Sequence, residues 1–204
     1  MEVIAMVQKG KETKNPEVSQ LTSDMKRGLE AFEAFMAHVD KKDVEAAVKR
    51  MEDFVAGKIT WAQVQELPKK FLADLAEFAY VQFKNNRFAE AEKIFRGLSV
   101  IDHQQSYYHT ALGAIYQKQS KHADSLVDYT VAINLNESDI VALVNRGEVY
   151  WTIGMATHAL EDLNKAINLD AENKNPWGNR ARFLRKQILD AIAKDPDLIK
   201  VEEP

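Results

Sequence analysis

The residue types that most often do chemistry in proteins are few in this sequence and are not arranged for it. The chain of 204 residues contains five histidines, His38, His103, His109, His122 and His158. None has a second ligand at a metal-binding spacing such as H-E-x-x-H, so we expect no metal site. We interpret His103 and His109 as structural, because isolated histidines in periodic helices usually pack against their neighbours.

Other catalytic arrangements are missing from the sequence as well. There is no cysteine, which excludes disulfides, thiolate metal sites and thiol catalysis. No G-x-S-x-G motif, glycine-rich phosphate loop or paired-carboxylate arrangement occurs. The sequence therefore predicts a protein that is not an enzyme and that needs no cofactor.

Charge and hydropathy exclude two further classes of partner. The formal net charge is -4, whereas a nucleic-acid binder normally carries a basic excess. Residues 1–7 are only slightly apolar and three lysines follow within residues 9–14, so we expect neither a signal peptide nor a membrane-spanning segment. The sequence predicts a cytoplasmic protein that binds no nucleic acid and does not insert into membranes.

The elements that position any binding residues are set by a period of 34 residues. Small residues recur at this step in two series, Ala79, Gly113, Gly147 and Ala181, and Ala91, Ser125 and Ala159. Such a pattern resembles tetratricopeptide (TPR) repeats, in which each unit is a pair of antiparallel helices. The two helices approach closely only where both present Ala, Gly or Ser, and larger residues such as Phe78, Phe95 and Leu98 fill the space between pairs.

The predicted fold class is all-α, a right-handed TPR superhelix with helices added at both ends. It contains three helix-turn-helix repeats, an N-terminal helical pair and a C-terminal capping helix. The predicted segments are a flexible tail (1–17), an N-terminal helical region (18–71), TPR 1 (72–105), TPR 2 (106–139), TPR 3 (140–173), the capping helix (174–195) and an acidic tail (196–204) that we expect to be disordered.

Two apolar stripes at helical spacing precede the repeats. The first runs from Val18 to Val39, and the second, with Asp43 as its cap, ends at Gly57. Because an apolar stripe needs a partner, two arrangements are open. The pair packs against the chain's own repeats, or it forms a homodimer through the N-terminal helices.

The candidate site is the concave wall, which in TPR arrays is lined by the first helix of each repeat. The peptide-binding groove predicted from those positions contains Tyr80, Phe83, Lys84, Tyr107, Ala111, Ala114, Lys118, Val144, Glu148, Trp151 and Arg182. The aromatic residues offer pockets for the apolar anchors of a peptide. Alternatively, Phe83 and Trp151 pack inside the array. Lys84 and Lys118 either attract an acidic segment or complement the helix dipole.

One known type of TPR groove is excluded. The dicarboxylate clamp that grips chaperone C-termini needs Lys and Asn where this sequence has Ala76 and Tyr80 in the first repeat. It needs Asn where Ala111 stands in the second, and Lys and Arg where Val141 and Asn145 stand in the third. The groove therefore offers apolar pockets in place of point charges.

The stretch 57–117 carries a more specific pattern than the period alone. After a glycine-initiated short helix it is similar to L-x-x-L-A-[YF]-x-x-[YF], then G-[KR]-[YF]-x-[DE]-A-x-x-x-F-x-x-L and L-D-H, with Phe78, Asn86 and Ile101 standing where these patterns have Leu, Gly and Leu. The matching residues are Leu75, Phe78, Ala79, Tyr80, Phe83, Arg87, Phe88, Glu90, Ala91, Phe95, Leu98, Ile101, Asp102, His103, Gly113 and Ala114. In these residues the chain resembles the class II chaperones of type III secretion, which hold translocator proteins.

The resemblance implies three TPRs, an N-terminal amphipathic helix often used in dimerisation, and a groove for an extended, partly apolar peptide. The chain departs from the family in three ways. Its N-terminal helical pair is longer, its basic capping helix is less typical, and Ser99 stands where members often have cysteine.

The predicted function is therefore non-catalytic interaction with another protein. The chain would bind an extended or helical peptide segment of its partner in the concave groove, as a translocator chaperone does. The alternative is an intracellular signalling or polarity adaptor that binds a folded partner, such as a small GTPase or a response regulator.

Overall fold

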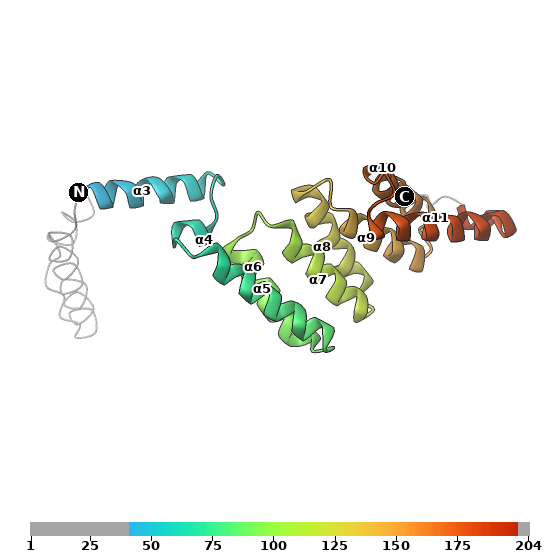
Figure 1. Ribbon diagram of the computed structural model, residues 1–204, viewed down its shortest axis with the longest axis horizontal. Coiled ribbons are helices and arrows are strands. Elements are labelled where there is room, and N and C mark those ends of the chain that lie inside the picture. The colour runs from blue at the N-terminus through green and yellow to red at the C-terminus, as the bar shows by residue number, and fades with distance from the viewer. Residues whose placement is uncertain (1–40, 200–204) are drawn as a thin grey trace, which may run out of the picture. The chain divides into compact units, whose positions relative to one another are not determined.

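The computed structural model describes residues 41–199, which contain helices and no strand (Figure 1). The chain divides into two compact units, Met1–Asp53 and Phe54–Pro204. The predicted tail at residues 1–17 and the helix predicted over 18–39 lie outside the described residues. The homodimer through the N-terminal helices therefore stays a prediction.

The described helices follow one another with short connections. They are α3 (Lys41–Val55), α4 (Trp61–Val64), α5 (Lys69–Lys84), α6 (Phe88–Ile101), α7 (Ser106–Lys118), α8 (His122–Leu135), α9 (Ile140–Thr152), α10 (Ala156–Leu169), α11 (Pro176–Lys194) and the 3-10 turn η1 (Pro196–Ile199). Within residues 41–199, no helix combines the length and the apolar character that crossing a membrane requires.

The segment before the repeats is fixed by local hydrogen bonds. Gly57, with φ of 71°, follows the end of α3, where its N–H bonds to the carbonyl of Phe54. Thr60 then starts α4 with a capping box, in which the Thr60 and Gln63 side chains each accept from the other's backbone N–H. The prediction that Asp43 caps its helix is wrong, because the described part of α3 already begins at Lys41.

Three turns at equivalent positions close the helical pairs α5–α6, α7–α8 and α9–α10. Asn86, Ser120 and Gly154 stand 34 residues apart, and all three adopt positive φ, at 58°, 58° and 86°. Glycine and asparagine reach this left-handed region at low cost, whereas other residues are strained there. The period thus fixes the tight turn that reverses the chain within each pair.

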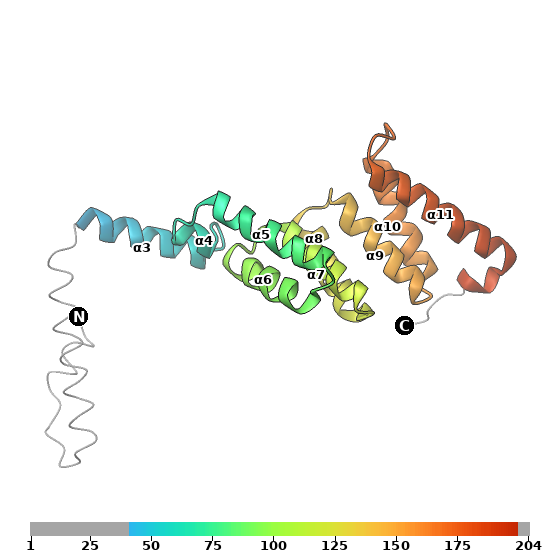
Figure 2. The ribbon, with the colours of Figure 1, turned by 60° about the horizontal axis from the view of Figure 1, so that its bottom comes forward.

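The pairs stack in chain order (Figure 2). The second helix of each pair packs on the first helix of the next, so α6 contacts α7, α8 contacts α9 and α10 contacts α11. The first helices α5, α7, α9 and α11 also contact one another in sequence. This arrangement confirms the predicted all-α fold of TPR type.

The small residues lie where the two helices of a pair meet. A Cβ on Gly113 would come within 2.6 Å of the Tyr129 ring of α8. The hydroxyl of Ser125 donates to the carbonyl of Gly113 at 2.9 Å, and Ala79 and Ala91 are completely buried in the first pair. These contacts give the physical reason for the recurrence seen in the sequence.

The larger residues fill the core with one exception. Phe95 and Leu98 of α6 are completely buried, and so is their counterpart Tyr129 in α8. Leu112 of α7 is buried at 3% exposure, whereas Phe78 at the equivalent position of α5 is 54% exposed. The prediction that Phe78 fills a layer between pairs is wrong within the described residues, because α5 packs there only against α6 and α7.

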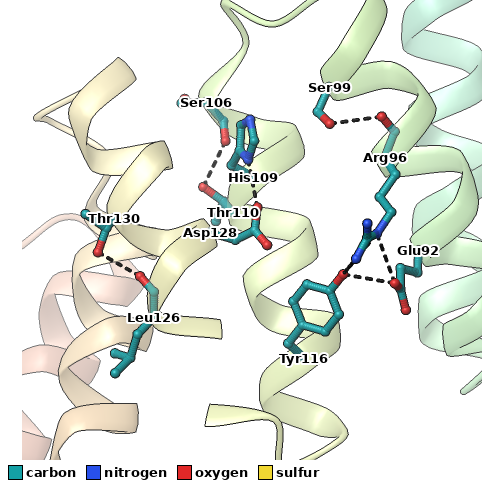
Figure 3. Close-up of polar contacts among 10 residues, drawn as sticks. All are labelled: Glu92, Arg96, Ser99, Ser106, His109, Thr110, Tyr116, Leu126, Asp128 and Thr130. Carbon is teal, nitrogen blue, oxygen red and sulfur yellow. Dashed lines mark hydrogen bonds and ion pairs between the residues drawn. The ribbon is translucent and has the colours of Figure 1, made fainter. Parts of the chain in front are cut away.

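Polar contacts hold neighbouring helices in register (Figure 3). The guanidinium of Arg96 donates to the hydroxyl of Tyr116, at 2.6 Å from Nη2, and that hydroxyl donates to Glu92 at 2.9 Å. These bonds connect α6 with α7. His109 of α7 pairs with Asp128 of α8 at 2.8 Å, which gives this histidine a structural role as expected.

The C-terminal end is more ordered than predicted. Residues Pro196–Ile199 form the turn η1, which packs on α10 and α11, so the predicted disorder of the tail is wrong for these four residues. Residues 200–204 lie outside the described part of the chain.

Candidate peptide-binding groove

A groove runs across the first helices of the repeats, which we call the concave groove. Its volume is about 300 Å³, and its walls come from α5, α7, α9 and α11, with Phe95 of α6 at its floor. Ala111 and Ala114 of α7 belong to the lining, and their short side chains leave this space open. The repeat spacing thus places equivalent helix faces around one hollow.

Most of the predicted groove residues line this hollow. They are Tyr80, Phe83, Lys84, Tyr107, Ala111, Ala114, Lys118 and Glu148. The structure brings them together from helices that are separated by up to two repeats. It also adds side chains that the sequence prediction did not include, among them Phe95, Trp177 and Arg180.

The first half of the groove is aromatic. The ring centroids of Tyr80 and Phe83 lie 6.2 Å apart, and those of Phe95 and Tyr107 lie 5.9 Å apart at a steep angle. Tyr80 and Tyr107 are 45% and 46% exposed, so their rings are held on one side and open on the other. The sequence left two roles open for Phe83, lining the groove or packing inside the array. Phe83 has both roles, since it lines the groove and also packs against the core around Phe95.

Tyr107 keeps its proton under ordinary conditions. Burial of the ring raises the pKa of Tyr107, and the nearby Tyr80 raises it further. A phenol that stays neutral can donate a hydrogen bond as well as offer an apolar face. Tyr107 can therefore bind both an apolar side chain and a backbone carbonyl of a peptide.

The far half of the groove is polar and its carboxylate is engaged. Nη2 of Arg180 lies 2.8 Å from each oxygen of Glu148, and Gln117 donates to Glu148 at 3.2 Å. The hydroxyl of the buried Tyr129 donates to Gln117 at 2.8 Å, and burial raises the pKa of Tyr129 far above its usual value. This chain of bonds ties α8, α7, α9 and α11 together beneath the groove.

Two predicted residues belong to the core instead. Val144 is completely buried among Leu143 and Leu163, and Trp151 packs against the same cluster. Trp151 therefore follows the alternative considered from the sequence, packing inside the array. Neither side chain is in the groove lining, so neither belongs to the candidate site.

The capping helix presents a different face from the one predicted. Arg182 donates to the carboxylate and the carbonyl of Asp170, at the turn that precedes α11. Trp177 and Arg180 face the groove instead, with the guanidinium 5.6 Å from the Trp177 ring centroid. Because residues two apart lie on opposite sides of a helix, Arg180 and Arg182 cannot both face the groove. The Trp and Arg three residues apart were the available sequence signal, since that spacing allows a cation–π contact.

A second and larger cavity adjoins the groove. It holds about 610 Å³ and shares Tyr80 and Tyr107 with the groove, so the two hollows meet at these rings. Its other walls include residues 60–67, which contain α4, and the turn at residues 102–105, and the Gln104 side chain donates to the Gly57 carbonyl at 3.1 Å. Sequence reasoning missed it because residues 60–67 and 102–105 lie outside the repeat positions from which the groove was predicted, although its α5 wall and Tyr107 stand at such positions.

In the described part of the chain, no three His, Asp or Glu side chains gather as they would around a metal ion. The groove and its neighbouring cavity are lined by rings, short aliphatic side chains and amides, together with a few charged side chains. Such surfaces suit the binding of a polypeptide segment.

The fold and the sequence agree on the class of protein. Residues 140–173, which contain α9 and α10, match the tetratricopeptide repeat family. The chain thus contains a tetratricopeptide repeat and has the fold of tetratricopeptide-repeat proteins.

One curated bacterial relative matches part of the chain. Over 80 residues the chain is 30% identical to the low calcium response locus protein H of Yersinia pestis, a match that covers 39% of this chain and 48% of the relative. The chain thus spans about half the length of this curated relative.

Solved structures of similar fold match over greater lengths. A T3SS complex from Aeromonas hydrophila matches with a TM-score of 0.64 and 20% identity, over 72% of this chain and 99% of that chain. The secretion chaperone SycD of Yersinia enterocolitica, in complex with a peptide of the translocator YopD, matches with a TM-score of 0.57 and 22% identity, over 64% and 98% of the two chains. At these identities the likeness shows the shared fold.

Proposed function

We propose that this protein is a non-catalytic chaperone that holds a peptide segment of a partner protein in the concave groove. The segment is extended or helical, and the partner is an export substrate, as in type III secretion translocator chaperones. In this proposal the protein acts in the cytoplasm. The binding residues are the groove-lining side chains of α5 and α7, with Arg180 and Trp177 of α11 closing the far end.

One observation carries the proposal: two half-exposed tyrosines stand between two hollows. Tyr80 and Tyr107 each leave close to half of the side chain open, although neighbouring aromatics hold them in place. Rigid aromatic anchors in partly desolvated pockets are typical of residues that dominate protein–peptide affinity. The groove and the cavity together offer about 300 and 610 Å³, room for several side chains of one segment.

The relatives support the same assignment. SycD has this fold and binds a peptide of the translocator YopD. The low calcium response protein H matches this chain at 30% identity over 80 residues. The resemblance of residues 57–117 to class II chaperones points in the same direction and includes Tyr80 and Phe83 of the groove.

The chemistry of the groove supports binding without catalysis. Within the described lining of the groove, Glu148 is the carboxylate, and both of its oxygens are bonded to Arg180. His109 lies outside that lining and is paired with Asp128. A general acid or base needs a group that is free to exchange a proton with a substrate.

The proposal is tested by replacing the two tyrosines with charged residues and measuring the loss of affinity for the partner. The partner is first co-purified with the full chain from its native host, identified by mass spectrometry, and reduced to a binding peptide by tiling. Changing Tyr80 and Tyr107 together to Glu should weaken this peptide by at least about tenfold, because apolar anchors would face carboxylates.

Phe78→Glu is the matched control for this test. Phe78 lies on the same helix, is 54% exposed and does not line the groove, so its replacement should leave peptide affinity unchanged. Circular dichroism should show equal helix content in all variants. Unchanged affinity of the double tyrosine variant would disprove the groove assignment.

A further inference from the structure

The concave groove carries two lysines that have no acidic partner among residues 41–199. Lys84 ends α5 and Lys118 ends α7, and both line the groove. Neither makes an ion pair or a side-chain hydrogen bond in the described part of the chain. Because they occupy equivalent repeat positions, 34 residues apart, they form a row of positive charge along one rim.

The remaining charges of the groove cancel one another. Glu148 is bonded to Arg180 through both carboxylate oxygens and also accepts from Gln117. Its negative charge is therefore unavailable to the lysines. The groove is left with an excess of positive charge, although the chain as a whole carries a formal charge of -4.

The lysines adjoin the apolar part of the groove. Lys84 directly follows Phe83, and Lys118 lies one helical turn beyond Ala114, so an apolar side chain seated between these residues has the ammonium groups close by. A bound segment would thus meet aromatic surface and positive charge within a few residues. Resting on the proposed function, we propose that the groove selects an acidic-apolar segment, in which Asp or Glu flanks a large apolar residue.

The charge of the second cavity determines the orientation in which the segment binds. Its lining contains Glu77 and Asp102 together with Lys69, so its charge is negative on balance. An acidic side chain placed there would be repelled. The carboxylates of the segment therefore lie against Lys84 and Lys118, and the end that enters the second cavity is neutral or basic.

The helix dipole alone could also explain why lysines stand at the ends of α5 and α7. Another lysine of the chain provides a control for this explanation. Lys194 stands in the last turn of α11, where a cation complements the dipole just as Lys84 and Lys118 do. Lys194 is exposed and does not line the groove. Replacing it removes the same charge from the same kind of position without touching the site.

The experiment selects peptides from a randomised display library with the full chain as bait. We expect the recovered peptides to share a large apolar residue with Asp or Glu close to it. With the Lys84→Gln/Lys118→Gln bait the apolar residue should persist and the acidic enrichment should vanish. The Lys194→Gln bait should recover the same acidic sequences as the unmodified chain.

Affinities of synthetic peptides then measure the effect. A selected peptide should bind more tightly than a version in which Asn and Gln replace its Asp and Glu. We expect a difference of about two- to fivefold for each lysine that pairs with a carboxylate, since each such ion pair is exposed at the rim of the groove. Raising the salt concentration should reduce this preference, because exposed charges are screened. The Lys84→Gln/Lys118→Gln variant should bind both peptides equally.

The outcomes separate this inference from the proposed function. Apolar peptides that bind through Tyr80 and Tyr107 with no preference for carboxylates would overturn the inference and leave the proposed function standing. An acidic preference that survives the Lys84→Gln/Lys118→Gln change, or that is lost equally with Lys194→Gln, would also overturn it. Recovery of no peptide that depends on the two tyrosines would overturn both.

Discussion

At the scale of single residues, the fold depends on a glycine that allows two helices to approach closely. Gly113 packs against Tyr129 so closely that a Cβ would stand 2.6 Å from the ring, and the ring itself is completely buried. Gly97 is also helical, yet a Cβ there would meet nothing within 4 Å. The same residue type thus has a packing role at one site and none at the other.

This contrast gives a stability prediction. Gly113→Ala should destabilise the protein by about 1–3 kcal/mol, because the new methyl group forces Tyr129 or the α7 backbone to move. Gly97→Ala should be neutral or stabilising by up to about 1 kcal/mol, since alanine favours the helix. Urea unfolding monitored by circular dichroism measures both changes. Equal effects of the two substitutions would contradict the packing role of Gly113.

At the scale of elements, predictability follows the repeat. The sequence could predict the turns at Asn86, Ser120 and Gly154 and the positions of the small residues. Each of these features recurs three times at the same spacing, which makes it recognisable. The orientation of α11 could not be predicted, because it includes a contact that lies outside the repeat pattern, the bond between Arg182 and Asp170. Without that contact in view, the repeat pattern places Arg182 in the groove.

Asp170 holds the start of α11 in place. One oxygen of its carboxylate accepts from Arg182 at 2.8 Å, and the other accepts from the backbone N–H groups of Lys174 and Asn175. Gly178 lies against this carboxylate so closely that a Cβ would overlap it. The bond from Arg182 and the two backbone bonds lower the pKa of Asp170 in the folded protein.

The lowered pKa predicts a dependence of stability on pH. Because the folded pKa of Asp170 lies below its unfolded value, the contribution of the carboxylate is complete above the ordinary Asp pKa of about 4 and is lost as the pH falls through the folded value. The difference in Tm between wild type and Asp170→Asn should therefore be largest near neutral pH and shrink below about pH 4. Thermal unfolding over a pH series measures it.

Asp190→Asn serves as the control for this prediction. Asp190 is an exposed residue of α11, so its replacement should leave Tm close to that of wild type at every pH. A Tm difference for Asp170→Asn that stays constant from neutral to acidic pH would contradict the role assigned to the ionised carboxylate.

At the scale of the whole molecule, the groove is a property of several repeats together. Tyr80, Tyr107 and Glu148 come from three successive repeats, and Arg180 comes from the capping helix. The repeat pattern could predict the first three, because equivalent helix faces line the same wall. It could not predict the second cavity, which depends on how residues 60–67, which contain α4, lie relative to the turn at residues 102–105.

The capping helix closes the core of the last repeat. Ala181 and Ile188 of α11 are buried in one cluster with Leu163 and Ala166 of α10. A repeat array whose last helix pair loses its cover exposes apolar surface to water. Ending the chain after Asn173 should therefore destabilise it by more than the roughly 2–5 kcal/mol expected for emptying one buried Ile or Leu site.

A chain that ends after Asp195 is the matched control. It keeps α11 and removes only the turn η1 and the residues beyond it, so the urea midpoint should stay near that of the full chain. A chain that ends after Asn173 also lacks Arg180, so Glu148 loses this partner and offsets one of the two groove lysines, which should weaken any preference for acidic peptides. Equal urea midpoints of the two truncated chains, measured by circular dichroism, would contradict the closing role of α11.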